Sequence, residues 1–293
     1  MSIWHKIEAL PLRAGLALLR TLGPVAASNL GGTVARNIGP LLPVSRIADA
    51  NLRLALPGLD EPARRHIIRN VWDNLGRTVA ELPHLAALKM TPAGPGWEAV
   101  GSELLTPHIA AGGPVLLFSA HIGNWEMLPA MAAHFGVQLS SFYRAASNPI
   151  SDRIIMDLRM AALPEDVPNF AKGSQGARLA LRHLTKGGWL GMLVDQKMND
   201  GIAAPFFGHT AMTAPAAAAM AIRFECPLIP AHVERLGPAR FRLVLEPSLP
   251  VRDTGDRQGD ILALTTAINA RLEQWIRARP GEWLWLHRRW PKG

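Results

Sequence analysis

Short apolar runs and longer helix-like segments alternate along most of the chain. Short runs of this kind predict buried β-strands, and apolar residues recurring every three or four positions predict α-helices with one apolar face. The predicted strands are 114–120, 137–143, 189–194, 227–234 and 241–246. The predicted helices are 125–134, 150–162, 174–186, 214–224 and 257–278. This alternation predicts an α/β fold with a mixed sheet flanked by helices.

The N-terminal third has a mainly helical pattern. Breaks are expected at Gly31-Gly32, Pro40, Pro43 and Pro57-Gly58. Asp60 is suited to cap the helix that follows it, because its side-chain oxygen can accept hydrogen bonds from free backbone N–H groups. The stretch PAGPGW at 92–97 predicts a boundary. We therefore expect a helical, membrane-associating region over 1–95 and an α/β catalytic region over 96–293, folded as one integrated domain.

The first helix-like segment, residues 3–20, has a basic face. Lys6, Arg13 and Arg20 are seven positions apart and therefore lie on one side of a helix. Leucines occupy other sides, and Trp4 is suited to the headgroup level of a bilayer. This pattern predicts an amphipathic helix lying in the membrane interface rather than a clean spanning helix. A basic stripe on a water-facing helix is the alternative.

Composition and charge narrow the functional classes. The chain has 293 residues, of which 48% are hydrophobic and 18% charged, so it is expected to be globular rather than disordered. Its net charge of +8 suits anionic lipid, phosphorylated substrates or an acidic carrier protein. It has no cationic cluster or aromatic RNA-binding signature, so we do not expect a nucleic-acid partner. The single cysteine, Cys226, excludes an internal disulfide.

The segment HIGNWE at 121–126 carries the most informative chemistry. It lies between a predicted buried strand and a predicted helix, and open α/β sheets bind ligands at such strand ends. Asn124 is the expected N-cap, which places Glu126 in the first helical turn, within reach of His121. His121 would then take the proton of a substrate hydroxyl, and Glu126 would hold the imidazole ring. A core histidine beside a helix-terminal charge is the structural alternative.

Other catalytic signatures are missing from the sequence. There is no Gly-x-Ser-x-Gly motif, no His/Cys cluster with zinc spacing, and no dinucleotide or P-loop fingerprint. We therefore expect no cofactor and no metal.

Several motifs in order resemble the late acyltransferases of lipid A biosynthesis, the lauroyl and myristoyl transferase family of Gram-negative bacteria. The motifs are ADANLRLALPGL (48–59), WDNLGRTVAELPHL (72–85), HIGNWE (121–126), YRAASNPISDRIIMDLR (143–159), LVDQ (193–196), PFFG (205–208), PLIP (227–230) and WLWLHRRW (283–290). This family is related to the wider glycerolipid acyltransferases that use His-x4-Asp/Glu. The resemblance implies the glycerolipid-acyltransferase-like fold.

The resemblance also implies roles for individual residues. His121 and Glu126 match the catalytic pair of the family. The residues expected to bind substrates are Asn124, Arg144, Arg159, Asp195 and Gln196. An arginine can bind phosphate through two parallel hydrogen bonds, which suits an acceptor or donor that carries phosphate. Phe206 and Phe207 are expected to line an acyl channel, with core packing as the alternative.

The reaction implied by the resemblance is acyl transfer at the cytoplasmic face of the inner membrane. The donor would be acyl carrier protein, with coenzyme A as the open alternative, and the acceptor a hydroxyl of a 3-hydroxyacyl chain on a phosphorylated glucosamine disaccharide. Two departures, Arg-Ala at 144–145 and Asp-Gln-Lys at 195–197, leave the acceptor position and chain length open. Two alternatives stay open: transfer to another lipid, such as a lysophospholipid or aminolipid, and a non-catalytic basic membrane-binding protein. The sequence does not predict the oligomeric state.

The C-terminal segment WLWLHRRW is rich in tryptophan and arginine. Trp283, Trp285 and Trp290 with Arg288 and Arg289 suggest a belt at the membrane interface. Core burial of Trp283 and Trp285 is the competing interpretation.

Overall fold

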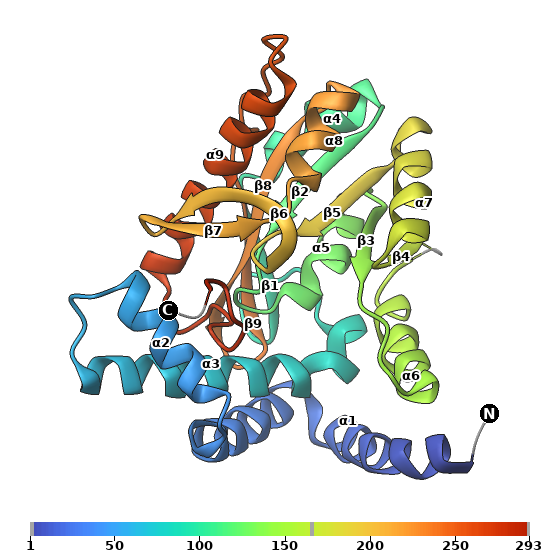
Figure 1. Cartoon of the computed structure of the whole chain (residues 1–293). Helices are drawn as coiled ribbons and strands as arrows, with labels where there is room; N and C mark the ends of the chain where they lie inside the picture. The colour runs from blue at the N-terminus through green and yellow to red at the C-terminus, as the bar shows by residue number, and fades with distance from the viewer. Residues whose placement is uncertain (1–2, 165–166, 292–293) are drawn as a thin grey trace.

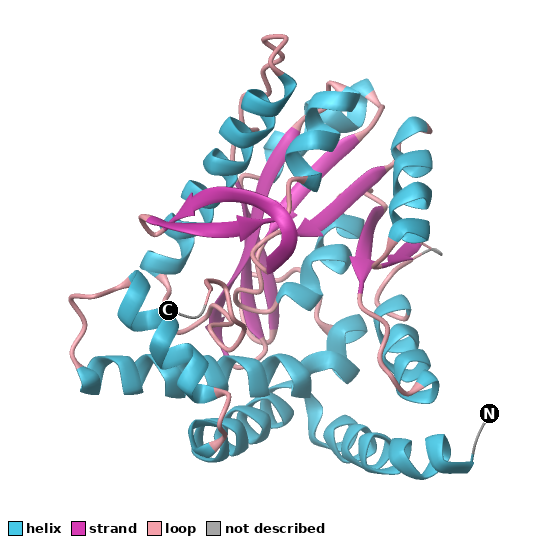
Figure 2. Ribbon diagram, in the orientation of Figure 1, coloured by secondary structure: helices cyan, strands magenta, loops and turns pink. Residues whose placement is uncertain are grey.

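A seven-stranded sheet flanked by helices forms the centre of the protein (Figures 1 and 2). The computed structural model describes residues 3–164 and 167–291, leaving out the side chains of residues 3, 6 and 7. The strands of the sheet are β1 (Gly96–Val100), β2 (Val115–Ser119), β3 (Leu139–Tyr143), β4 (Asn169–Ala171), β5 (Trp189–Leu193), β8 (Leu228–Gly237) and β9 (Arg240–Leu245). Their order across the sheet is β1-β9-β8-β2-β5-β3-β4.

The sheet is mixed, as the sequence predicts. Strands β8, β2, β5, β3 and β4 are parallel, whereas β9 runs antiparallel to β8 and pairs with β1 in parallel. All five predicted strands are present, with ends shifted by at most three residues. The sequence analysis missed the short β4 and the edge strand β1, whose runs are brief and partly exposed.

A separate hairpin of β6 (Lys197–Phe206) and β7 (His209–Thr213) crosses in front of the sheet in Figure 1. This hairpin was not predicted. Its first strand has the exposed residues Met198, Asn199 and Asp200 near its start and Pro205 near its end, so it lacks the apolar run typical of a buried strand.

Helices cover the sheet and form the N-terminal region. The α-helices are α1 (Ile3–Ile38), α2 (Ser45–Ala55), α3 (Glu61–Glu81), α4 (Thr106–Ala111), α5 (Leu128–His134), α6 (Pro149–Met160), α7 (Ser174–Thr185), α8 (Ala216–Phe224) and α9 (Arg257–Ala278). The 3-10 helices are η1 (Gly39–Leu41), η2 (Leu82–Ala87), η3 (Ser102–Leu105) and η4 (Trp125–Met127). The five helices predicted after residue 100 are confirmed, although the first of them begins as η4 before α5.

The N-terminal helices share a core with the sheet. Leu52 of α2 and Val71 of α3 are buried in the same cluster as Phe118 of β2 and Leu272 of α9. Asp60 caps α3 as expected, because its Oδ1 accepts a hydrogen bond from the backbone N–H of Ala63 at 2.9 Å. The N-terminal helices therefore pack against the sheet in one shared hydrophobic core.

The expected break of the first helix at Gly31-Gly32 is wrong. Helix α1 runs through both glycines, and its backbone leaves helical geometry instead at Gly23, with φ 71° and ψ 165°. Gly31 is required for packing: a Cβ there would collide with the carbonyl oxygen of Gly76 on α3, and a Cβ on Gly76 would collide with the carbonyl oxygen of Gly31. The two glycines thus let the backbones of α1 and α3 come into direct contact.

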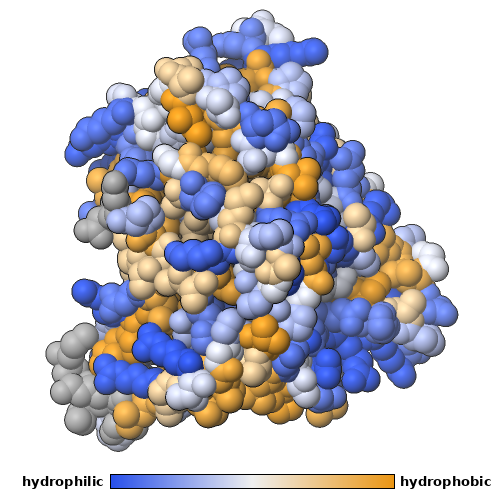
Figure 3. Space-filling view, turned by 180° about the vertical axis from the view of Figure 1, so that it is seen from behind, coloured by the Kyte–Doolittle hydropathy of each residue, from blue (hydrophilic) through white to orange (hydrophobic). Residues whose placement is uncertain are grey.

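Helix α1 also carries exposed apolar side chains, and Figure 3 shows apolar residues along the lower edge of the molecule, where α1 lies in Figure 1. These side chains include Leu10, Leu18, Leu22, Val25, Leu30 and Val34. Among the residues described by the structure, no helix combines the length and hydropathy that a bilayer span requires. Of the predicted basic face, Arg13 and Arg20 are exposed, whereas the side chain of Lys6 lies outside the described part.

The expectation of an interfacial belt at the C-terminus is wrong for the tryptophans and Arg289. Trp283, Trp285 and Trp290 are 0%, 0% and 4% exposed, which is the core burial weighed as the alternative. The Arg289 guanidinium lies over the Phe206 ring at 4.7 Å, and its burial lowers the pKa of Arg289 to about 10. Trp283 packs edge-to-face against Trp285 and against Phe206 of the hairpin, and Trp290 stacks on Phe206.

We expect Gly76→Ala to lower the melting temperature, since the added methyl group must push α1 and α3 apart. The cost of overpacking at such a contact is about 1–3 kcal/mol. Thermal unfolding followed by circular dichroism measures the change. Gly15→Ala is the matched control on α1, because a Cβ at Gly15 has nothing within 4 Å. Equal melting temperatures for Gly76→Ala and wild type would show that the glycine contact is dispensable.

Candidate active site

His121 and Asp195 meet because their strands are neighbours. His121 follows β2, Asp195 follows β5, and these two strands pair in parallel at the centre of the sheet (Figure 1). The pairing continues past the strand ends, where the backbone N–H of Val194 donates to the carbonyl oxygen of Ser119 at 3.0 Å. Both side chains therefore lie at the carboxyl edge of the sheet, where α/β folds bind ligands.

The carboxylate of Asp195 holds His121 by two hydrogen bonds. Nδ1 of His121 lies 2.8 Å from Oδ1, and the backbone N–H of His121 donates to Oδ2 at 3.0 Å. Trp283 Nε1 donates to Oδ2 as well, at 2.8 Å. Burial by itself raises the pKa of Asp195, but the charge and hydrogen bonds of His121 outweigh it and hold that pKa below its usual range. Asp195 is therefore ionised at neutral pH and accepts a hydrogen bond from the protonated Nδ1 of His121.

Gln196 and Lys172 complete the surroundings of the imidazole. Lys172 Nζ donates to Gln196 Oε1 at 3.2 Å, and Gln196 Nε2 lies 3.5 Å from His121 Nε2. Since an ammonium only donates, Lys172 turns the amide so that its NH₂ group faces His121. Nε2 of His121 is then the unprotonated ring nitrogen, which agrees with a hydrogen on Nδ1. The sequence analysis missed Lys172, because it follows the unpredicted strand β4.

His287 is a second residue that the sequence analysis did not single out. Its Nε2 lies 3.3 Å from the carbonyl oxygen of Asp195, and its Nδ1 lies 2.7 Å from that of Leu284. Burial lowers the pKa of His287, so this imidazole is neutral at pH 7. A neutral imidazole carries a single N–H, so it donates to only one of these two carbonyl oxygens, and the shorter distance favours that of Leu284. The place of His287 within the C-terminal motif WLWLHRRW was the only sequence signal for it.

The predicted contact between Glu126 and His121 is wrong. Glu126 does lie in the first turn after the strand, in η4, but no hydrogen bond joins it to His121 in the part of the chain that the structure describes. Both carboxylate oxygens instead accept from Arg159, from Nε at 2.6 Å and from NH2 at 2.7 Å. This pairing raises the pKa of Arg159 against the opposing effect of burial. Asp195 takes the place beside the imidazole that was expected for Glu126.

Helix α3 fixes the backbone of the HIGNWE loop. Asn74 Nδ2 donates to the carbonyl oxygens of Gly123 and Glu282, at 2.9 and 3.0 Å, and Thr78 Oγ1 donates to that of Gly123. Gly123 has φ 58°, and a Cβ there would collide with the carbonyl oxygen of Val233. Only glycine fits this turn, and α3 holds it in place.

Asn124 does not cap the helix as expected. Its side chain makes no capping hydrogen bond and is fully buried, with Nδ2 donating to Glu81 Oε2 at 2.7 Å. Glu81 also accepts from NH1 and NH2 of Arg235, at 2.6 and 2.9 Å, and from Ser28 Oγ at 2.6 Å. The buried carboxylate attracts the amide inward more strongly than the free N–H groups of η4, so Asn124 faces the interior rather than a substrate.

The remaining predicted residues divide between surface and core. Arg144 follows β3, is exposed, and makes no ion pair with other described residues. Phe206 and Phe207 are buried and contact Trp283, Trp285 and Trp290, so core packing, the alternative to an acyl channel, describes both in this structure. Of the predicted site, the structure brings together His121, Asp195 and Gln196, with Glu126 and Arg159 paired nearby.

We expect Glu81→Gln to destabilise the protein strongly, since it leaves the buried Arg235 guanidinium without its counter-charge. Breaking a buried pair costs about 3–5 kcal/mol. Glu61→Gln is the control: Glu61 is also on α3, but its ion pair with Arg65 is exposed, and such pairs contribute at most about 1 kcal/mol. Urea unfolding measures both. A loss for Glu81→Gln no larger than for Glu61→Gln would contradict the assigned role of the network.

The sequence matches a known family over most of its length. A family model described as bacterial lipid A biosynthesis acyltransferase matches residues 11–292, nearly the whole chain. No curated protein is significantly similar to it. The match includes α3, the HIGNWE loop, Asp195 and the C-terminal tryptophans. The chain belongs to the bacterial lipid A biosynthesis acyltransferase family.

Proposed function

We propose that the protein transfers a fatty acyl group from an acyl carrier protein thioester to a hydroxyl of a lipid A precursor, with His121 as the general base. The observation that carries this proposal is the hydrogen bond between His121 Nδ1 and the buried, ionised Asp195. It leaves Nε2 unprotonated at the carboxyl edge of the sheet. A base in this state can accept a hydroxyl proton, and Asp195 stabilises the imidazolium that forms.

The proposed reaction is a direct transfer. His121 Nε2 takes the proton as the acceptor hydroxyl attacks the thioester carbonyl, and a C–O bond forms. The tetrahedral intermediate then collapses: the C–S bond breaks, and the imidazolium returns its proton to the leaving thiolate. Gln196, whose NH₂ group faces Nε2, gives way to the hydroxyl and donates to the carbonyl oxygen as negative charge develops there.

The pair of Glu126 and Arg159 has a binding role in this proposal. Nε and NH2 of Arg159 are occupied by Glu126, whereas NH1 has no hydrogen bond with the described residues. A guanidinium held in this way presents its remaining N–H groups in a fixed direction, which suits a phosphate of donor or acceptor. Exposed Arg144 is a second candidate for the same purpose. The exposed apolar side chains of α1 support a location at the inner membrane.

We expect purified wild type, mixed with acyl–acyl carrier protein and a tetra-acylated lipid A precursor, to add one acyl group to the precursor. Loss of the base in His121→Ala should lower the rate by about 10²–10⁴-fold. Mass spectrometry of the lipid product measures both. His209→Ala is the control, because His209 is exposed at the start of β7.

The outcomes separate the rival functions. Transfer only to a lysophospholipid or aminolipid would replace the proposed acceptor. Wild-type binding to membranes without any acyl transfer would favour the non-catalytic alternative. Normal turnover by His121→Ala would remove His121 from the mechanism.

We expect Asp195→Asn to lower kcat by about 10²-fold or more, because the amide neither fixes the tautomer nor stabilises the imidazolium.

The lowered pKa of Asp195 also predicts a stability effect. Its contribution is present above the ordinary value of 3.8 and is lost as the pH falls through the lower folded value. Wild type should therefore lose stability below about pH 4 more steeply than the variant. Unfolding curves between about pH 2 and pH 7 measure this, and an equal loss of stability in both proteins below pH 4 would contradict it.

A further inference from the structure

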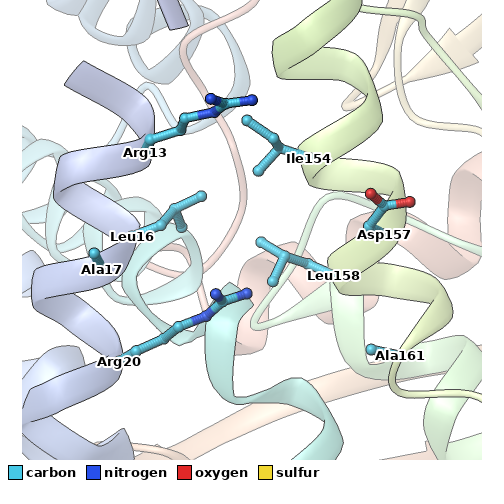
Figure 4. Close-up of a pocket in the computed structure, with 8 residues that line it drawn as sticks. All are labelled: Arg13, Leu16, Ala17, Arg20, Ile154, Asp157, Leu158 and Ala161. Carbon is cyan, nitrogen blue, oxygen red and sulfur yellow. The ribbon is translucent and has the colours of Figure 1, made fainter. Parts of the chain in front are cut away.

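A groove between α1 and α6 is separate from the residues around His121. It has a volume of about 350 Å³. Its lining residues are Arg13, Leu16, Ala17, Arg20, Ile154, Asp157, Leu158 and Ala161 (Figure 4). The first four belong to α1 and the others to α6 and the residue that follows it.

Two arginines mark the ends of this groove. Arg13 and Arg20 are seven residues apart, which places them about 10.5 Å apart along the helix axis and on nearly the same face. Both side chains extend toward α6 in Figure 4. Neither makes an ion pair with other described residues, although Asp157 lies in the groove. Asp157 Oδ1 accepts from Arg153 Nε at 2.8 Å instead. Both guanidinium groups therefore remain open to an anionic ligand.

Apolar side chains lie between the two charges. Leu16 from α1 and Ile154 and Leu158 from α6 face one another across the groove (Figure 4). Leu18 and Leu22, about half a turn away on α1, are exposed. This arrangement, cationic at two points and apolar between them, matches an amphiphile with two separated anionic groups.

Helix α6 connects the groove to the candidate active site. Leu158 lines the groove, and its neighbour Arg159 holds Glu126 by two hydrogen bonds. The groove and the arginine that binds Glu126 therefore share one helix, α6.

We propose that this groove binds the two phosphate groups of the acceptor, one at Arg13 and the other at Arg20, while Leu16, Ile154 and Leu158 contact its apolar part. The inference rests on the proposed function and adds the place where the acceptor's phosphates bind, the groove between α1 and α6. A lysophospholipid, with one phosphate, engages only one end.

The test compares Arg13→Gln and Arg20→Gln with wild type, using a bisphosphorylated, tetra-acylated glucosamine disaccharide in detergent micelles. Each variant loses one charge-assisted contact, so KM for this acceptor should rise about tenfold while kcat stays within about twofold. Arg252→Gln is the matched control. Arg252 is exposed, makes no ion pair with other described residues, and lies in the loop before α9, far from α1 in Figure 1.

A monophosphorylated form of the same acceptor tests the pairing of each arginine with one phosphate. Wild type should show a raised KM with it. The variant that lacks the arginine for the missing phosphate should show no further increase, whereas the other variant should. Equal increases for both acceptors in both variants would overturn the assignment.

A vesicle-binding assay distinguishes recognition of the acceptor from general binding to a bilayer. Sedimentation with vesicles of phosphatidylcholine and phosphatidylglycerol reports general binding to anionic lipid. If the two arginine variants bound these vesicles tenfold more weakly but kept an unchanged KM in micelles, the arginines would be assigned to the membrane surface and the proposal would be overturned. Unchanged KM for both variants, with active wild type, also overturns it. An inactive wild type would instead refute the proposed function, and direct binding of the bisphosphorylated acceptor to wild type and variants still tests the groove.

Discussion

Asp195 has no exposed surface, and its two carboxylate oxygens together accept hydrogen bonds from a ring nitrogen, a backbone N–H and an indole N–H. Removing such a charge from water costs free energy unless its oxygens are fully hydrogen-bonded. The requirement for these partners joins three distant segments: the end of β2, the end of β5 and the C-terminal Trp283. The geometry around His121 follows from satisfying this one carboxylate.

A second buried carboxylate, that of Glu81, holds together the segments around the loop that bears His121. Glu81, at the end of α3, is bonded to Asn124 and to Arg235 on β8. Asn74 lies two turns before it on the same helix and holds Gly123. Asn74, Thr78 and Glu81 of the motif WDNLGRTVAE thus form one helical face directed at the loop rather than at solvent. The early helical region contributes to the site by supporting it.

The sequence predicted the mixed α/β fold and the position of HIGNWE, because β2 and β5 are short apolar runs whose composition alone marks them as strands. It did not predict which carboxylate meets His121. That depends on β2 and β5 being adjacent, and strand order is not encoded in local periodicity. Five-residue spacing favoured Glu126, yet Arg159, distant in sequence, pairs with it. The tryptophans were ambiguous for a similar reason: amphipathic rings suit both a membrane interface and a core that offers each N–H an acceptor.

The contacts of the C-terminal segment have a consequence for biosynthesis. Trp283 donates to Asp195, and the backbone N–H of Leu284 donates to the carbonyl oxygen of His121 at 3.0 Å. Chains fold progressively from the N-terminus as they leave the ribosome. His121 and Asp195 therefore emerge well before the residues that complete their hydrogen bonds. A chain still attached to the ribosome can bury much of its sheet while its reactive centre stays unassembled, so competence for chemistry has to wait until Trp283 and Leu284 have been synthesised.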